Sequence, residues 1–593
     1  MSIVTASPIL AAAGGSFLLE ECTFTEVFTP EDLNEEQQQI AATAARFARE
    51  QILSATADIE AKEPGAMEKV LRKAAELGFT AVDIPEEYGG MSMDKVTSTV
   101  VTDHLSVLAS FSTAFGAHTG IGTLPLVWYG TEEQKQRYLP KLATCEWIAA
   151  YGLSEASSGS DAMNIGTRAA LSADGSHYIL NGEKQWITNC GIAGLYTVFA
   201  KIDGQRFSAF LIERDTPGLS IGAEEHKLGI LGSSTCPLIL VDCRVPKENL
   251  LGEPGKGHHI AFNVLNVGRL KLGVACVGGA RHALMHMIRY AKQRHAFGKP
   301  IADKGLIQRK ISSSAARLYA AESMAYRTVG LIDARLGESK TDVPRTIGEY
   351  AVECSILKVY GSEMLSHVSD ELMATMGGYG YVEEYPAARF YRDARINRIF
   401  EGTNEINRLI ITGWLMKQAM AGKLPLPAAI QRIMDEVTEP RSFDSSSGDD
   451  DAPLAREAAI VSSARKIALF VAGVASQRFM SELEQQQEIM ADLADMIGQI
   501  YALESSLLRA QKLVAAGRSS AQVAAAMTGL VAEDTMALAE QSARRVLATC
   551  GEGDALRTQL AILRRLARFT PGDSTAFSRS VARQCIEQER YPM

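Results

Sequence analysis

Apolar side chains recur at three- and four-residue spacing through the first quarter of the chain, and this spacing is typical of amphipathic helices. The segment 33–53 shows it clearly behind Asn34, whose side chain favours helix N-caps. Residues 65–78 show it again and end at a glycine, a common helix stop. The pattern predicts a helical N-terminal domain over residues 34–149, preceded by an N-terminal extension over 1–33.

After this region the spacing changes to short runs that are rich in β-branched and aromatic residues. HYILNGEKQWITN (177–189) and PLILVDCRVP (237–246) are examples, and Gly, Asp, Asn and Pro separate such runs. These features are typical of strands joined by turns, and Asn181-Gly182 predicts a hairpin turn. We therefore predict a middle β domain over residues 150–255.

Helical spacing returns after the β domain, and residues 256–420 are predicted to form an antiparallel helical bundle. EPRSFDSSSGDDDAP, within 421–454, is rich in Ser, Asp and Gly and has no apolar pattern, so we predict a mobile acidic linker there. Residues 455–593 have helical spacing again and are rich in Ala, Leu and Arg, which predicts an extra helical domain. The fold class that these patterns predict is mainly α with a central β domain.

Composition and charge exclude several classes of protein. The 593 residues are 46% hydrophobic and 22% charged, as in ordinary globular proteins of several domains. The net charge of −10 argues against non-specific binding to nucleic acid or to anionic membranes. No run of 18 apolar residues occurs, so no membrane-spanning helix is expected, and the N-terminus lacks the basic stretch of a signal peptide. Nine scattered cysteines without a C-x-x-C pair suit a reducing compartment.

The stretch RIFEGTNEINR (398–408) places Glu401 between a phenylalanine and a glycine, directly before a predicted helix start. A lone glutamate at such a position is usually a solvated surface charge. The same carboxylate is a candidate general base if the fold buries it beside a substrate. Thr403 or Asn404 is expected to cap the following helix and so to fix the direction of the carboxylate.

Four other motifs suggest binding chemistry, and each is a weak signal alone. YGLSEASSGSD (151–161) exposes hydroxyls and N–H groups that suit a flat polar ring or a phosphate, or it is a plain Ser/Gly turn. WITN (186–189) offers a tryptophan for ring stacking, or a buried strand residue. RHAFGKP (294–300) offers an arginine as a pyrophosphate clamp, or as a cation that the helix dipole favours. MGGYGY (376–381) permits close approach to phosphates.

Two further patterns argue against other sites. His282 and His286 have the i, i+4 spacing of a metal pair, but no glutamate stands in the H-E-x-x-H position and no third ligand is evident, so no metal site is predicted. His258-His259 is expected to lie on the surface at a helix start. No G-x-G-x-x-G follows a predicted strand, which argues against a Rossmann dinucleotide site.

Together and in this order, the motifs at 151–161, 186–189, 294–300 and 376–381 and the segment FEGTN (400–404) resemble the acyl-CoA dehydrogenase family. The resemblance implies a helical N-terminal domain, a β-barrel-like middle domain and a C-terminal four-helix bundle, with FAD between them. The very-long-chain type of this family carries an extra C-terminal helical domain. The tail of this chain has about that length, so that branch is the most similar one.

The resemblance implies site residues motif by motif. Glu401 matches the catalytic base; some members place the base where Gly268 stands here, which leaves Glu401 for that role. The residues that match FAD contacts are Tyr151, Leu153, Ser154, Gly159, Ser160, Trp186, Ile187, Thr188, Arg294, Phe297, Gln308, Gly377, Gly378, Thr403 and Glu405, partly across a dimer interface. The residues that match substrate contacts are Ser160, Asn266, Gly268, Arg269, Phe400 and Gly402. Many relatives have Gln where Ala374 stands, so one hydrogen bond to FAD is missing or is supplied elsewhere.

The reaction that the resemblance implies is the α,β-dehydrogenation of a long- or very-long-chain acyl-CoA to trans-2-enoyl-CoA in fatty acid β-oxidation. Glu401 removes the α-proton while the β-hydrogen leaves as hydride to flavin N5. The Glu401 N–H and a ribityl hydroxyl stabilise the enolate-like oxygen. An apolar pocket is expected to raise the pKa of Glu401 toward the working pH. Gly116, Gly120 and Gly122 leave room for a long acyl chain, or they are only turn and packing glycines.

The resemblance also implies an electron-transfer flavoprotein as acceptor and a homodimer, with the tail over a bundle face that pairs dimers in simpler members. We expect a soluble cytoplasmic protein with at most peripheral membrane contact, because the linker lacks a basic amphipathic pattern. Two alternatives stay open: an acyl-CoA oxidase that passes electrons to oxygen, and a scaffold or assembly protein on a dehydrogenase fold.

Overall fold

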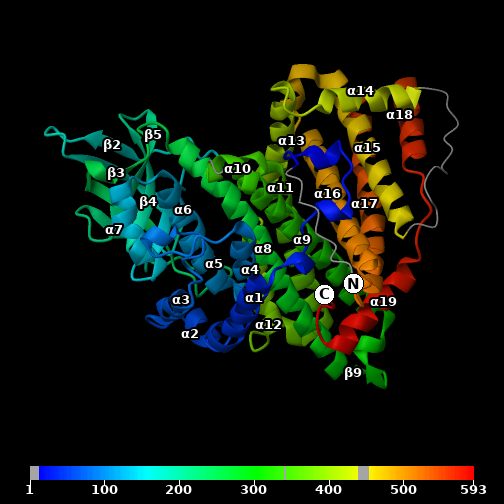
Figure 1. The fold of residues 1–593 in the computed structure, drawn as a ribbon, viewed down its shortest axis with the longest axis horizontal. Coiled ribbons are helices and arrows are strands. Elements are labelled where there is room, and N and C mark those ends of the chain that lie inside the picture. Colours follow the sequence, from blue (N-terminus) through cyan, green and yellow to red (C-terminus); the bar gives the residue numbers. More distant parts are fainter. Residues whose placement is uncertain (1–11, 339–341, 439–452) are drawn as a thin grey trace.

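The computed structural model describes residues 12–338, 342–438 and 453–593. In Figure 1 a β region lies at one end of an elongated molecule, long helices fill the middle, and the helices of the C-terminal tail lie at the other end.

The helices of the N-terminal region pack around an apolar core of their own that includes Phe47, Leu71 and Phe111. Asn34 caps the first of them, because its side chain accepts a hydrogen bond from the Gln37 N–H at 2.8 Å, as the sequence predicts. The helices here are α1 (Glu35–Phe47), α2 (Thr56–Glu60), α3 (Ala66–Glu76), α4 (Lys95–Leu105), α5 (Ala109–Gly116), α6 (Leu124–Tyr129) and α7 (Glu132–Ala143), with π-helical turns η4 (Ala48–Ile52) and η6 (Ala117–Gly122).

The middle region is an eight-stranded sheet with the order β6-β7-β3-β2-β4-β5-β8, in which β1 pairs with β4 in parallel. Its strands are β1 (Ala149–Gly152), β2 (Arg168–Leu171), β3 (His177–Thr188), β4 (Leu195–Ile202), β5 (Arg206–Glu213), β6 (Leu219–Ile221), β7 (Thr235–Pro246) and β8 (Leu250–Leu251).

The predicted hairpin turn at Asn181-Gly182 is wrong. Both residues lie inside the long strand β3, where the pairing with β7 shifts register between Leu180 and Gly182. A Cβ at Gly182 would lie 2.4 Å from the Thr167 Oγ1, so glycine is needed for a close backbone approach. A bulge with a glycine and a tight turn with a glycine share the same local sequence signal.

Long helices from residue 257 onward form the bundle in the middle of Figure 1. They are α8 (Gly257–Gln293), α9 (Gly305–Glu338), α10 (Val343–Glu349), α11 (Ala351–Met376), α12 (Pro386–Ile396) and α13 (Asn404–Met420), with the short strands β9 (His295–Ala296) and β10 (Lys299–Pro300) and the 3-10 turn η9 (Gly377–Tyr381).

Two helices of the described chain are long and apolar enough to span a membrane by composition, namely α8 and the helical stretch Ala455–Gln485. The fold accounts for their composition, because 67% of each apolar window is buried inside the protein.

The tail packs against the bundle as one continuous body. Its helices are α14 (Leu426–Thr438), α15 (Ala455–Phe479), α16 (Gln487–Ala515), α17 (Ala521–Cys550), α18 (Gly553–Leu566) and α19 (Ser574–Gln588). A single apolar core joins bundle residues such as Tyr319 and Leu357 to tail residues such as Tyr501 and Leu507.

The linker predicted over 421–454 is wrong in its first half. Leu426–Thr438 forms the helix α14, which packs against α15. The polar composition that led to the prediction belongs to the residues after this helix, whereas LPAAIQRIMDEV has apolar positions at helical spacing. Residues 439–452, which carry the Ser/Asp-rich stretch, lie outside the described residues.

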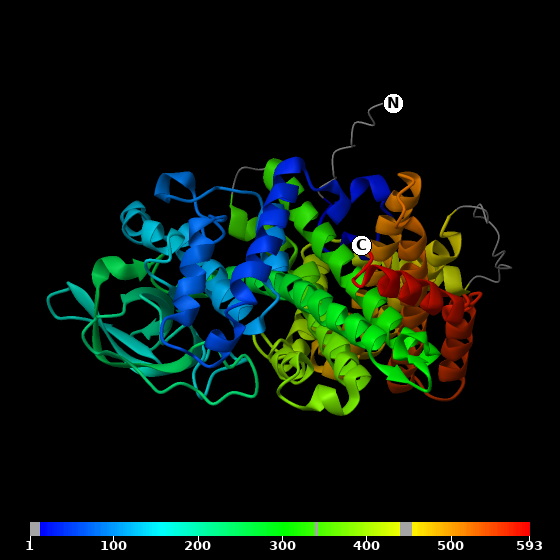
Figure 2. The ribbon, with the colours of Figure 1, turned by 90° about the horizontal axis from the view of Figure 1, so that it is seen from below.

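The described part of the N-terminal extension crosses the junction between the bundle and the tail (Figure 2). The Gly15 N–H donates to Glu353 Oε1 of α11 at 2.6 Å, and the ring of Phe17 lies 4.6 Å from that of Tyr501 on α16. The sequence did not indicate this role, because the contacts join residues more than 300 positions apart.

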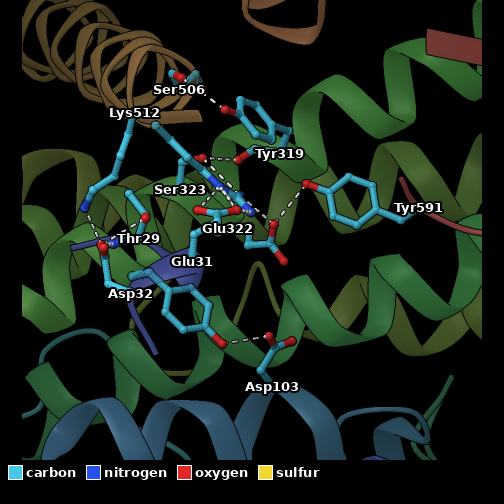
Figure 3. A network of polar contacts seen from close by, with 12 residues as sticks. Thr29, Glu31, Asp32, Asp103, Tyr319, Glu322, Ser323, Ser506, Lys512 and Tyr591 are labelled. Carbon is cyan, nitrogen blue, oxygen red and sulfur yellow. Dashed lines mark hydrogen bonds and ion pairs between the residues drawn. The ribbon is translucent and has the colours of Figure 1, made fainter. Parts of the chain in front are cut away.

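A buried charge network ties these parts together (Figure 3). Arg509 of α16 is almost fully buried and bonds to Glu31 at 2.7 Å and to Glu322 of α9 at 2.6 Å. Glu322 also accepts from Arg281 of α8 at 2.6 Å, and Arg281 in turn bonds to Asp103 of α4 at 2.8 Å. The network therefore links the N-terminal extension, the N-terminal helices, the bundle and the tail.

Candidate active site

Glu401 lies on a strained turn between α12 and α13. Its φ is +58° and that of Gly402 is +82°, and the left-handed region is costly for a glutamate but not for a glycine. The side chain of Asn407 donates to the Gly402 carbonyl at 2.8 Å, and Lys358 of α11 donates to the same carbonyl at 2.7 Å. These bonds hold the turn in its unusual conformation. Of the two predicted caps, Thr403 caps α13 through the Ile406 N–H at 3.3 Å.

The carboxyl group of Glu401 has the electrostatic environment of a base. Burial raises its pKa to about 7, although Arg269 and Lys358 act in the opposite direction. Its Oε2 atom is buried and has no hydrogen-bond partner among the described residues. A carboxyl with a pKa near 7 is suited to accept a proton at neutral pH.

Helix α8 approaches Glu401 so closely that only a glycine fits. A Cβ at Gly268 would lie 2.4 Å from Glu401 Oε2. Any larger residue would therefore displace the carboxylate, and Gly268 acts by leaving space for it.

Glu401 stands between two cavities, because it lines both of them together with Phe400, Ile121 and Thr188. The first, the acyl cleft, has a volume of about 100 Å³ and lies between α4, α5, η6 and α8; apolar residues such as Leu105 line most of it. The second, the ring cavity, has a volume of about 590 Å³ and is bounded by the β domain and the bundle.

The ring cavity has the lining that a flavin requires. Trp186 has a φ of +58° and is 58% exposed, so its ring faces the cavity rather than the strand interior. The hydroxyl of Tyr151 is buried without a hydrogen-bond partner in the described chain. An aromatic wall beside hydroxyl and backbone donors suits a flat polar ring, so the residues fit FAD.

A buried ion pair shapes the loop that lines this cavity. Lys184 of β3 is fully buried, and it donates to Glu155 Oε1 at 2.6 Å and to the Leu153 carbonyl at 3.3 Å. Glu155 also accepts from the Gly166 N–H at 2.5 Å. The pair thus fixes the segment 151–161 in the conformation that opens toward the ring cavity.

The structure brings most of the predicted residues together and leaves a second group apart. Those that line the ring cavity with Glu401 are Tyr151, Leu153, Ser154, Gly159, Ser160, Trp186, Ile187, Thr188, Asn266, Arg269, Phe400 and Gly402. Gly268 lines the acyl cleft, and Thr403 and Glu405 lie at the start of α13. Those that lie outside both cavities at the far end of α8, at the start of α9 and on η9 are Arg294, Phe297, Gln308, Gly377 and Gly378.

Two of the segments that carry this second group, the end of α8 and η9, lie next to each other. The Arg294 guanidinium lies 5.8 Å from the ring of Tyr379 on η9, so the end of α8 and η9 meet. Phe297 is 91% exposed.

Sequence reasoning missed the residues that hold the site in place. Lys358 is fully buried in α11, Asn407 is fully buried at the start of α13, and Lys184 lies inside a strand. A lysine in an apolar helical stretch was the available signal, since a buried lysine needs partners.

His282 and His286 lie side by side on α8 with their Nε2 atoms 3.3 Å apart. Burial and the nearby Arg289 and Arg389 lower the pKa of His282 to about 3 and that of His286 to about 4, so both rings are neutral near pH 7. Within the described ranges no group of three His, Cys, Asp or Glu residues is placed to hold a metal ion.

A buried carboxyl base between a narrow apolar cleft and a ring-sized cavity defines the class: an enzyme that removes a proton beside a flat cofactor. Family models described as acyl-CoA dehydrogenase match most of the chain. The N-terminal, middle and C-terminal domain models match residues 34–146, 150–243 and 255–416, and a further model with the C-terminal domain description matches residues 463–565.

Individual relatives agree with the family models. The chain is 45% identical over 586 residues to a probable acyl-CoA dehydrogenase of Bacillus subtilis (strain 168), and 98% of each chain is covered. It is 36% identical over 422 residues to the mitochondrial short-chain specific acyl-CoA dehydrogenase of Rattus norvegicus, with 70% of this chain and 99% of the relative covered.

The solved structure of an acyl-CoA dehydrogenase complexed with FAD from Bacillus anthracis superimposes with a TM-score of 0.95. The identity is 45%, and the match covers 98% of this chain and 100% of that one. This chain belongs to the acyl-CoA dehydrogenase family. It is an FAD-dependent flavoprotein oxidoreductase with the three domains of that fold and an extra C-terminal helical domain.

Proposed function

We propose that the protein dehydrogenates long- or very-long-chain acyl-CoA to trans-2-enoyl-CoA in fatty acid β-oxidation, with Glu401 as the base. The observation that carries the proposal is the Glu401 carboxyl, which has a pKa of about 7 and stands between the acyl cleft and the ring cavity. A base at this point meets the α-carbon of a thioester whose acyl chain lies in the cleft and whose CoA end leaves through the ring cavity.

Each group at the turn has a task in this mechanism. The Glu401 carboxylate takes the α-proton, and its backbone N–H, which makes no hydrogen bond within the described residues, donates to the thioester oxygen as enolate-like charge develops. The Arg269 Nε donates to the Glu401 carbonyl at 3.4 Å and helps to hold the turn. Tyr151, Trp186 and Thr188 line the ring cavity and would hold FAD, which would supply the acceptor for the β-hydrogen as hydride.

The long-chain preference is supported by glycines at the wall of the cleft. Gly116 and Gly120 both line it, and a Cβ at Gly116 would meet no atom within 4 Å. Side chains at these positions would point into space that the acyl chain needs. Comparison of kcat/KM for butyryl-CoA and palmitoyl-CoA tests this part, and a higher value for butyryl-CoA would contradict it.

We also propose a cytoplasmic homodimer that passes electrons to an electron-transfer flavoprotein and touches membranes at most peripherally. The dimer is supported by the large exposed side chains of Phe297 and Tyr381, which are 91% and 81% exposed. Arg294 and Phe297 match FAD contacts of the family but lie away from the ring cavity, which fits their supply to this cavity by a second copy of the chain. Light scattering on the purified protein measures the oligomeric state directly.

The decisive experiment compares wild type with Glu401→Gln under anaerobic conditions. Wild type should bleach its flavin absorption on addition of palmitoyl-CoA and form enoyl-CoA. Glu401→Gln keeps the shape of the side chain without the base, so it should bind palmitoyl-CoA and leave the flavin oxidised. Normal flavin reduction in the variant would reject Glu401 as the base, and rapid peroxide release by wild type in air would indicate an oxidase instead.

A further inference from the structure

The acyl cleft has further cavities next to it. A small cavity of about 50 Å³ follows it and shares the lining residues Ser106, Ser112 and Asn397 with it. This small cavity in turn shares Val107 and Arg389 with a third cavity of about 1040 Å³. The three cavities therefore adjoin one another in order from Glu401 to Arg389, and Arg389 lines the last two.

The length of this path can be estimated along helix α8, because residues of α8 line all three cavities. Gly268 faces Glu401, Gly279 lines the small cavity, and His282 lines the large one. A helix rises about 1.5 Å per residue, so His282 lies roughly 21 Å from Gly268 along the axis. With C–C bonds of about 1.5 Å an extended alkyl chain advances about 1.25 Å per carbon, so roughly 17 carbons span this distance.

The far cavity is basic where the path enters it. Two arginines of its lining are already neutralised: Arg281 by Asp103, and Arg392 by Glu383. Arg389 is half-buried, and within the described residues no carboxylate lies at ion-pair distance from it.

The neighbours of Arg389 do not supply its counter-ion. Asp393 lies one turn further along α12, but its Oδ1 accepts from the Ile230 N–H at 2.5 Å, and burial raises its pKa to about 6. His282 and His286 are neutral near pH 7, and Arg289 adds a second positive charge to the same cavity. Acidic residues also line these cavities, including Asp393 in the small one and Glu60, Glu383 and Glu384 in the large one, but among the described residues none of them lies at ion-pair distance from Arg389.

Polar groups line the path where the acyl cleft meets the small cavity. Thr113, Ser106, Ser112 and Asn397 line both of them and contribute hydroxyl and amide groups. A terminal methyl group gains little from such surroundings, whereas a carboxylate gains a charge-assisted bond to a guanidinium.

We propose that the enzyme also accepts long acyl chains that carry a carboxylate at their far end, the CoA thioesters of long-chain dicarboxylic acids, and that Arg389 binds this carboxylate. The inference rests on the proposed acyl-CoA dehydrogenation and names a further substrate class for the same site. The chain lies along α8, its α-carbon beside Glu401 and its terminal carboxylate at the junction of the small and large cavities.

The test compares hexadecanedioyl-CoA with palmitoyl-CoA in the FAD-loaded enzyme. We expect the kcat/KM ratio of the two substrates to lie within about tenfold of one in wild type, and Arg389→Gln to lower this ratio by about tenfold or more. Arg389→Lys keeps the charge and should restore much of the ratio. The matched control is Arg392→Gln, on the same helix and in the same cavity, whose guanidinium is occupied by Glu383.

A second test varies the length of the acyl chain. The carboxylate of decanedioyl-CoA would stop near Ala275, where the acyl cleft meets the small cavity and short of Arg389, at about 1.25 Å per carbon. Its kcat/KM relative to decanoyl-CoA should therefore be far below the ratio for the sixteen-carbon pair in wild type, and Arg389→Gln should not change it.

The outcomes separate the inference from the proposed function. Failure of wild type to turn over palmitoyl-CoA contradicts the long-chain function itself. Turnover of palmitoyl-CoA with a dicarboxylate ratio that is the same in wild type and Arg389→Gln, or with no advantage of sixteen carbons over ten, overturns only the inference.

Discussion

Two local features give the Glu401 side chain its chemistry. The positive φ of its backbone directs the carboxyl toward the junction of two cavities, and burial there raises its pKa to about 7. Gly402 is visible in the sequence, and a glycine at this position indicates a turn. The raised pKa has no such signal, because it depends on α8 and α11 packing around the turn.

The pH dependence of the reaction follows from that pKa. The base acts only when deprotonated, so kcat/KM for palmitoyl-CoA should be constant above pH about 7 and should fall about tenfold per unit below it. The measurement is kcat/KM from pH 5.5 to 9, with the flavin spectrum recorded at each pH to show that FAD stays bound. A profile that stays flat down to pH 5.5 would mean that the working pKa is that of an ordinary glutamate.

Gly268→Ala tests the close approach of α8. The new Cβ would lie 2.4 Å from Glu401 Oε2, so the carboxylate must move by about 1 Å, a displacement that costs on the order of 100-fold in rate. We expect kcat to fall by about that factor while FAD is retained. Gly413→Ala on α13 is the control, because its Cβ would meet no atom within 4 Å. Full activity of Gly268→Ala would show that the carboxylate has room to spare.

At the scale of elements, contacts between distant segments decide where helices and strands sit. Asn181-Gly182 sits in a bulge of β3 rather than in a turn, because β7 pairs along both sides of it. Leu426–Thr438 is helical because α15 covers its apolar face. Local sequence led to a wrong prediction in both places, a hairpin turn and a linker, because the partner element decides what each segment becomes.

The buried Arg509 of α16 links the tail to the bundle. Arg509→Met would leave Glu31 and Glu322 without their shared cation, and loss of one partner of a buried charge network costs about 3–5 kcal/mol. We expect a clear drop in the thermal unfolding midpoint. The control is Arg545→Met on α17, whose half-exposed pair with Asp492 should contribute less than about 1 kcal/mol. Equal effects of the two variants would contradict the structural role of the network.

At the scale of the whole molecule, the tail and the bundle share one apolar core. The N-terminal extension packs across their junction, and its Glu31 joins Arg509 in the charge network. The tail is therefore part of the body that carries α8 and α11 rather than an appended domain with a core of its own.

Hydrogen exchange measured by mass spectrometry tests this shared core. Peptides from α16 and α17 should exchange at the same rate as peptides from α9 and α11 as denaturant increases, because elements with one core open together. The middle β domain has its own core and serves as the internal reference. Exchange of the tail at lower denaturant than the bundle would show that the two open separately.

The sequence by itself determined the order of helical and β regions, the cap at Asn34 and the motifs that gather around the ring cavity. These are local properties: periodicity, caps and short motifs depend on neighbours along the chain. Only the tertiary structure decided the pKa of Glu401, the bonds from Lys358 and Asn407 that hold its turn, and the path from the acyl cleft to Arg389. Those depend on burial and on charges brought together from distant positions, and no local pattern carries that information.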